Sequence, residues 1–191
     1  RMVLPKTTNY QIRLVLREGD LLSELNKEVK HGEFDIAIMG SPRRKRITNK
    51  ISQFLDTSIF FVKNFNPNWN YKILLCVDDS RATKRAVILS TRISKQFDAE
   101  IISLTVSKTS FFGKGYRNAH TWAERYLKRV GIPFESKLLS GNPVDVFVDE
   151  AGEDHIIIMG KAKGNEILKF IFGSKPIHTA QRSNCPVLMV N

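Results

Sequence analysis

Short apolar runs alternate with amphipathic segments from residue 71 to the end of the chain. The most informative run, residues 156–159 (IIIM), is continuously apolar and β-branched, which is typical of a parallel strand covered on both faces. The whole pattern predicts strands at 72–78, 100–106, 134–140, 155–159 and 186–190, with helices at 81–97, 117–130, 143–152 and 175–183. This alternation predicts an α/β fold, a doubly wound parallel five-stranded sheet with helices on both faces. Such sheets bind ligands at the carboxyl ends of their strands, near a switch in strand order.

The first part of the chain repeats half of this pattern. Residues 11–63 resemble residues 134–191, with a strand at 12–20, an amphipathic helix at 21–30, a strand that ends in Met-Gly, a helix, and a closing strand at 58–63. Two or three strands bury little apolar area alone, so we expect them to pair with the second unit, with another chain or with a preceding segment.

Turn signals in residues 64–70 (NFNPNWN) indicate a linker between the two parts. We therefore predict a partial repeat at residues 1–66, which contains only the second half of the fold, and a complete domain at residues 71–191.

A candidate anion site follows the strand at 155–159. Gly160 lets the backbone turn and a ligand approach, although it could serve the turn alone. Gly173 and Ser174 stand directly before the predicted helix at 175–183, whose free N–H groups and positive dipole favour phosphate. The intervening loop is basic and contains Lys161, Lys163 and Lys169. A solvated surface loop is the alternative interpretation.

Polar residues also follow the strand at 72–78. Asp78 and Ser80 lie at its carboxyl end, and Val106 ends the next strand along the chain. Because the carboxyl ends of parallel strands meet at one edge of a sheet, we expect Asp78, Val106 and Gly160 at the same edge. Asp78 could instead be the N-cap of the following helix, a role for which Asp79 and Ser80 compete.

These residues resemble the motifs of the universal stress protein family. Its nucleotide-binding members have a strand ending in Met-Gly, a second glycine shortly afterwards, and a third glycine followed by Ser or Thr. Gly160, Gly173 and Ser174 match that motif, whereas Lys163 replaces the middle glycine. The family's first strand typically ends in Val-Asp followed by a small residue and Ser, and this chain reads Val77-Asp78-Asp79-Ser80.

The resemblance implies ATP or another adenine nucleotide, such as AMP, as the ligand. Asp78 and Val106 would flank the adenosine part, and the glycine loop would hold the phosphates. The predicted nucleotide-binding residues are Val77, Asp78, Ser80, Val106, Gly160, Lys161, Lys163, Gly164, Gly173, Ser174 and Lys175.

The resemblance also bears on assembly. Members of the family commonly pair through the last strand, which implies a homodimer, or an intramolecular pseudo-dimer with residues 58–63 beside residues 187–190.

The net charge of +11 suits a phosphate-rich partner. However, the sequence contains no helix-turn-helix pattern, zinc-finger spacing or aromatic RNA-binding signature, so we expect no specific nucleic acid partner. The densest basic cluster, residues 43–46, is typical of a solvated loop.

No apolar run approaches the roughly 18 residues of a membrane span. With neither a span nor a secretory pattern, we expect a cytoplasmic location.

Chemistry-bearing residues are sparse. The histidines have no metal-ligand spacing, so we expect no metal site, and Cys76 and Cys185 are expected in the core. No nucleophile motif is present, so we expect no enzymatic activity beyond slow ATP hydrolysis.

The sequence supports two hypotheses about function. The chain is either a nucleotide-binding module in stress response or regulation, or a nucleotide-free regulatory domain that acts by protein contacts, such as the cytosolic tail of a membrane transporter.

Overall fold

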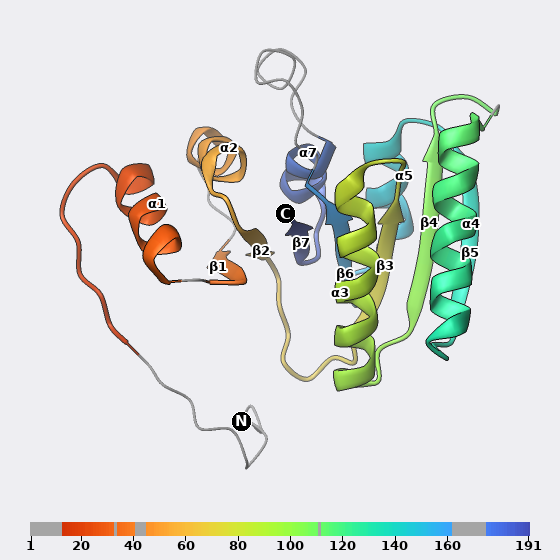
Figure 1. The fold of residues 1–191 in the computed structure, drawn as a ribbon, viewed down its shortest axis with the longest axis horizontal. Helices are drawn as coiled ribbons and strands as arrows, with labels where there is room; N and C mark the ends of the chain where they lie inside the picture. The colour runs from red at the N-terminus through yellow and green to blue at the C-terminus, as the bar shows by residue number, and fades with distance from the viewer. Residues whose placement is uncertain (1–12, 33, 41–44, 111, 162–174) are drawn as a thin grey trace.

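The structure is a computed structural model that describes residues 13–32, 34–40, 45–110, 112–161 and 175–191 (Figure 1). Its first segment forms α1 (Leu21–Gly32), β1 (Ile36–Gly40), α2 (Lys45–Phe54) and β2 (Ser58–Val62). The following elements are β3 (Lys72–Val77), α3 (Arg81–Phe97), β4 (Ile101–Ser107), α4 (Lys114–Arg129), β5 (Phe134–Ser140), α5 (Pro143–Glu150), β6 (His155–Gly160), α7 (Lys175–Arg182) and β7 (Val187–Val190). The alternation predicted from the sequence is confirmed.

The described strands form one seven-stranded sheet in the order β1-β2-β7-β6-β3-β4-β5. Neighbouring strands are parallel except for β2 and β7, which are antiparallel. The five strands from β7 to β5 are the predicted parallel sheet, so the predicted α/β fold class is confirmed. The sheet is wider than predicted because β1 and β2 extend it. The strand order reverses at β3, which lies between β6 and β4, and such a switch is where ligands bind in open α/β sheets.

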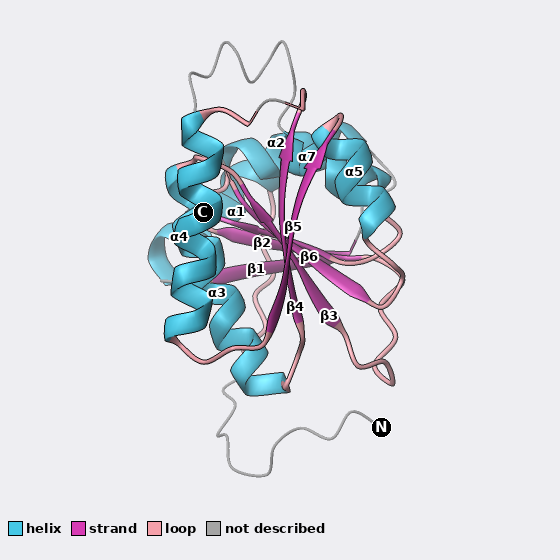
Figure 2. Cartoon of the chain, turned by 90° about the vertical axis from the view of Figure 1, so that its right-hand side faces the viewer, coloured by secondary structure: helices cyan, strands magenta, loops and turns pink. Residues whose placement is uncertain are grey.

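Helices cover both faces of this sheet (Figure 2). On one face, α3 and α4 pack side chains such as Val87 and Leu127 against Leu75 of β3. On the other face, side chains of α2, α5 and α7 belong to the same buried cluster as Leu74 of β3. Leu74 and Leu75 therefore enter different halves of the core, which explains why the central strands are continuously apolar.

The two parts of the chain join through β2 and β7. In this antiparallel pair, Phe61 lies opposite Val187 and Ile59 lies opposite Met189. The predicted pairing of residues 58–63 with residues 187–190 is therefore confirmed. These four side chains are all buried, so the first segment of the chain shares a hydrophobic core with residues 71–191.

Polar contacts reinforce the same junction. The ammonium group of Lys63 donates to the carbonyl of Ser183 at 2.7 Å, and the Asn64 side chain donates to the carbonyl of Asn184 at 3.1 Å. In the predicted linker, Phe65 stacks on Tyr71 with ring centroids 5.1 Å apart. The linker is therefore held by side-chain contacts at both of its ends. The domain division near residue 66 stays a prediction.

The prediction of a strand at residues 12–20 is wrong over the part that the structure describes. Residues 13–20 form no strand, and Leu14 and Leu16 are 93% and 100% exposed. A strand needs a neighbour for its backbone hydrogen bonds. In the second half of the chain, the matching strand β5 has β4 as its neighbour. The described part of the first segment contains no strand that could pair with residues 13–20 in the same way.

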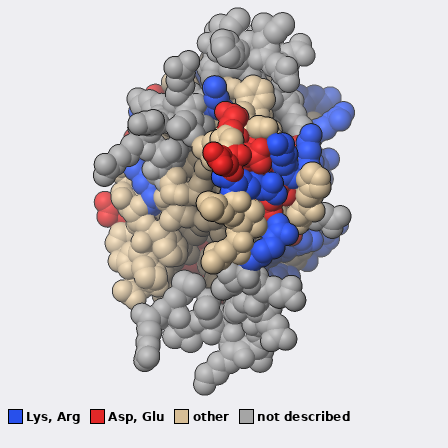
Figure 3. Space-filling model, turned by 90° about the vertical axis from the view of Figure 1, so that its left-hand side faces the viewer, with Lys and Arg blue, Asp and Glu red and all other residues tan. Residues whose placement is uncertain are grey.

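Charged contacts hold this extended segment instead. The guanidinium groups of Arg13 and Arg17 pair with Glu28 of α1, and Arg17 also approaches Glu24 at 3.4 Å. Figure 3 shows acidic and basic side chains interleaved on this side of the molecule. Arg43 and Arg44 of the predicted basic loop lie outside the described residues.

Candidate functional site

A hydrogen-bonded turn joins the carboxyl end of β3 to α3. Ser80 is the N-cap of α3, and its Oγ accepts a hydrogen bond from the backbone N–H of Thr83 at 3.3 Å. Oδ1 of Asp78 accepts from the backbone N–H of Ser80 at 3.0 Å and from the Thr83 hydroxyl at 2.5 Å. Of the residues that competed for the N-cap, Ser80 fills it, and Asp78 fixes the turn that carries the cap.

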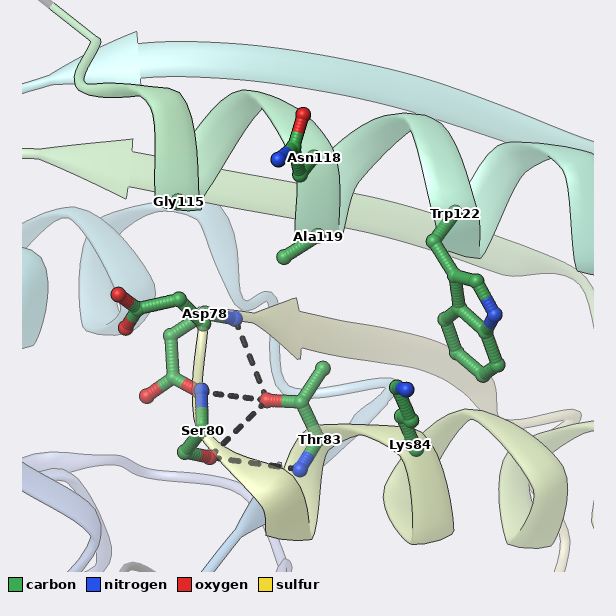
Figure 4. Close-up of a pocket in the computed structure, with 9 residues that line it drawn as sticks. Asp78, Ser80, Thr83, Lys84, Gly115, Asn118, Ala119 and Trp122 are labelled. Carbon is green, nitrogen blue, oxygen red and sulfur yellow. Dashed lines mark hydrogen bonds between the residues drawn. The ribbon is translucent and has the colours of Figure 1, made fainter.

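A pocket of about 350 Å³ opens beside this turn, between α3 and α4 (Figure 4). Its volume is in the range of small-molecule binding sites. The side of β3 and α3 contributes Asp78, Asp79, Ser80, Thr83 and Lys84, and α4 contributes Gly115, Asn118, Ala119 and Trp122.

The wall supplied by α4 is one face of a helix. Gly115, Asn118, Ala119 and Trp122 are spaced three or four residues apart, which brings them onto one side of α4. Gly115 lies close to the β3 turn, since a Cβ there would lie 2.8 Å from Oδ2 of Asp79. A side chain at this position would narrow the entrance to the pocket.

The far end of the pocket is aromatic. Trp122 stacks on Tyr126 of the next helical turn, with centroids 5.4 Å apart. The ammonium group of Lys84 lies 5.6 Å from the Trp122 ring centroid, a cation–π geometry. The pocket thus offers two carboxylates at one end, an aromatic ring at the other and a cation beside the ring. This arrangement suits a ligand that combines a planar ring with hydroxyl groups.

Gly160 is required by packing at the end of β6. A Cβ on Gly160 would lie 2.7 Å from the backbone nitrogen of Thr83 and 2.9 Å from Cβ of Ala82. The end of β6 therefore approaches the first turn of α3 closely, and only a glycine allows this distance. The structure thus gives Gly160 a role in helix–strand packing that the sequence did not reveal.

Two predicted site residues point into the core. Val77 is buried in the half of the core beneath α3 and α4, and Val106 in the half beneath α5 and α7. Both stand at carboxyl ends of neighbouring strands, as predicted, but neither lines the pocket between α3 and α4.

Lys161 bridges the two parts of the chain. Its ammonium group donates to the carbonyl of Leu55, one residue beyond α2, at 2.5 Å, and its backbone N–H donates to Val190 at 2.6 Å. Lys175 is exposed at the start of α7. The remaining predicted phosphate ligands, Lys163, Gly164, Gly173 and Ser174, lie outside the described residues.

Sequence reasoning missed the whole α4 wall of the pocket. The predicted helix began at residue 117, whereas α4 begins at Lys114, so Gly115 was placed in a loop. The spacing of Gly115, Asn118, Ala119 and Trp122 was a usable signal, because it marks one helical face that combines small, polar and aromatic side chains. Thr83 and Lys84 could have been found from their place in the first turn after the Asp78 strand.

The two thiols are buried, which confirms their prediction as core residues. Burial raises the pKa of the Cys76 thiol well above its ordinary value, and the negative charge of Asp78 adds to this effect. Burial likewise raises the pKa of Cys185 to about 11. Both thiols are therefore protonated at neutral pH and are poor nucleophiles.

Among the described residues, no group of three or more His, Cys, Asp or Glu side chains could hold a metal ion. None of the described helices is both long enough and apolar enough to cross a membrane.

The fold, the strand-order switch and the pocket beside the Asp78–Ser80 turn define a doubly wound α/β domain. A sequence model of the universal stress protein family matches residues 70–191. The chain therefore belongs to the universal stress protein family, as its motifs predicted.

Individual relatives agree with this assignment. The chain is 25% identical over 138 residues to a universal stress protein of Methanocaldococcus jannaschii, covering 62% of this chain and 81% of the relative. A universal stress protein structure from Archaeoglobus fulgidus matches with a TM-score of 0.74 and 18% identity, covering 91% of this chain and 66% of that one. The present chain thus spans about two thirds of that structure. A universal stress protein in complex with cAMP matches with a TM-score of 0.53 and 22% identity, covering 63% of this chain and 97% of that one.

Proposed function

We propose that this chain binds an adenine nucleotide, such as AMP or ATP, and acts in stress response or regulation through binding rather than turnover. The observation that carries the proposal is the pocket between α3 and α4, which lies at the carboxyl end of β3 beside the switch in strand order. The similar structure in complex with cAMP supports the choice of an adenine nucleotide.

The adenosine part fits the pocket's chemistry. The carboxylates of Asp78 and Asp79 can accept hydrogen bonds from ribose hydroxyls, as acidic residues do in other dinucleotide-binding folds. Ala119 and Trp122 offer apolar contact to a base, and Lys84 can approach a phosphate or a ring nitrogen.

The phosphates are proposed to extend toward the end of β6, where Gly160 and the predicted residues Lys163, Gly164, Gly173 and Ser174 follow in the sequence. Lys161 is left out of this set, because its ammonium group donates to the carbonyl of Leu55.

Binding without rapid turnover is proposed because the ionisable side chains that line the pocket are those of Asp78, Asp79 and Lys84. None of these is paired with a histidine or a metal cluster within the described residues. We expect slow ATP hydrolysis at most.

A nucleotide-free regulatory module is the second candidate. Two predicted phosphate-site residues have structural roles that require no ligand, since Gly160 allows close packing on Thr83 and Lys161 bonds to Leu55. In that case the chain would act through protein contacts alone.

We also propose that the first segment is a partial repeat of the second. The order α1-β1-α2-β2 matches α5-β6-α7-β7, and each half ends in a parallel strand pair.

Calorimetric titration with AMP, ATP and cAMP at low and high salt tests the nucleotide proposal. Asn118→Phe adds a ring to an exposed, pocket-lining position and should weaken binding at least about tenfold. Thr121→Phe, on the same helix but outside the pocket lining, should leave the affinity within about twofold. Absence of heat with every nucleotide at low salt would leave the nucleotide-free module as the function.

A further inference from the structure

The positive charge of the chain is concentrated on one face of the molecule. α3 carries five Lys or Arg residues and no Asp or Glu, and α4 carries five against the single Glu124. These two helices therefore contribute +9 of the net +11 of the whole chain. On the opposite face of the sheet, the three acidic residues of α5 offset most of the five basic residues of α2 and α7, so these three helices together contribute only +2.

The basic side chains are available to a partner. All ten are exposed, and none forms an ion pair with a residue that the structure describes. We call these residues the basic face: Arg81, Lys84, Arg85, Arg92, Lys95, Lys114, Arg117, Arg125, Lys128 and Arg129. Two acidic residues lie nearby. Oε1 of Glu124 is 3.5 Å from Nε2 of His120, and Asp79 lines the pocket. Such unpaired charge in one layer is available to neutralise an anionic surface.

The basic face is broad and made of two helices in one layer. α3 and α4 lie side by side on the same face of the sheet (Figure 1). Their cations recur at helical spacing along about 21 Å of α3, as at Arg81, Arg85 and Arg92, and along a similar length of α4. A layer of this kind can meet many anionic groups in a plane at the same time.

We propose that the basic face docks on a membrane surface that contains anionic lipids. A bilayer presents many negative headgroups in a plane, and basic side chains near that surface add attraction independently of sequence-specific contacts. Binding of this kind is peripheral and is weakened by salt, because the interaction is electrostatic.

The geometry favours a bilayer over nucleic acid. Sequence-tolerant binding of single strands needs free aromatic faces on which bases stack. Here Trp122 lies in the pocket and stacks on Tyr126, and the cation of Arg129 lies over the Tyr126 ring at 5.3 Å, so these two rings form no row of separate platforms for successive bases. Reading a duplex needs an element that enters a groove, whereas α3 and α4 both lie flat against the sheet.

Sedimentation with lipid vesicles tests the proposal. The wild-type chain should bind vesicles of phosphatidylcholine that contain about one-third phosphatidylserine at low salt, and phosphatidylcholine vesicles at least about tenfold more weakly. Arg92→Glu/Arg125→Glu, which reverses one cation on each helix outside the pocket, should weaken binding at least about tenfold. Lys30→Glu/Lys50→Glu makes the same change in net charge on α1 and α2 and should stay within about twofold.

Three results would overturn the proposal. The first is no binding to phosphatidylserine vesicles at low salt by wild-type protein with an intact circular dichroism spectrum. The second is an equal loss in the two double variants, which would mean that net charge alone matters. The third is tighter binding of duplex DNA or single-stranded RNA than of the vesicles at equal phosphate concentration. Nucleotide titrations of the same variants report separately on the pocket.

Discussion

The backbone nitrogen of Thr83 lies 2.7 Å from the position that a Cβ on Gly160 would occupy. Gly160→Ala should therefore force β6 and α3 apart and lower the free energy of unfolding by about 1–3 kcal/mol. Urea denaturation measures this change.

Gly40 provides the matched control. Like Gly160, it follows a methionine and ends its strand, but a Cβ added to Gly40 would meet no atom within 4 Å. Gly40→Ala should change stability by less than about 0.5 kcal/mol. Equal effects of the two substitutions would contradict the packing role of Gly160.

The junction of β2 with β7 gives a second prediction. Phe61 is buried opposite Val187, so Phe61→Ala should cost about 3–5 kcal/mol and leave a single unfolding transition, because both parts share one core. Ile38, 71% exposed on β1, serves as control, and Ile38→Ala should cost less than about 1 kcal/mol. Two separate transitions in the wild-type protein would show instead that the two parts unfold independently.

Much of the fold could be predicted from the sequence, because periodicity records burial. The run at residues 156–159 is apolar throughout since β6 is covered on both faces, and the helix boundaries of α3 were predicted correctly. The strand at 12–20 was predicted wrongly because an apolar pattern indicates a possible strand but not whether a partner strand exists.

The site was less predictable. Asp78 and Ser80 were found from their motif, and both line the pocket. The α4 wall was missed because a pocket between two helices depends on how far apart they pack, which local sequence does not encode. The contact of Lys161 with Leu55 joins residues far apart in the chain, and the basic loop pattern around Lys161 gave no sign of it.

Lys161 supports a third prediction. Lys161→Met removes the hydrogen bond to the Leu55 carbonyl, so the free energy of unfolding should fall by about 1 kcal/mol. Nucleotide affinity should stay within about twofold, because this ammonium group is directed at α2 rather than at the pocket. Thermal denaturation and calorimetry of the same sample measure both quantities, and a tenfold loss of ATP affinity without loss of stability would restore Lys161 as a phosphate ligand.

A fourth prediction concerns pH. The Cys185 thiol has an ordinary pKa of 9.0 and a pKa of about 11 in the folded protein, because burial disfavours the thiolate. Between these values the unfolded chain has lost a proton that the folded protein keeps, so this thiol makes stability fall as pH rises. Urea denaturation at pH 8 and about pH 10.5 should show a smaller decrease for Cys185→Ala than for the wild-type protein. An identical decrease in both proteins would argue against ionisation of this thiol.

The central claim, that the pocket between α3 and α4 binds an adenine nucleotide, is tested most directly through Trp122. The chain has two tryptophans, so Trp69→Phe leaves Trp122 of the pocket as the sole tryptophan reporter. Titration of this variant with AMP should give a saturable change in tryptophan fluorescence, and adding Asn118→Phe should weaken the apparent affinity at least about tenfold. A flat fluorescence signal at millimolar AMP, with binding detected elsewhere or not at all, would contradict the account.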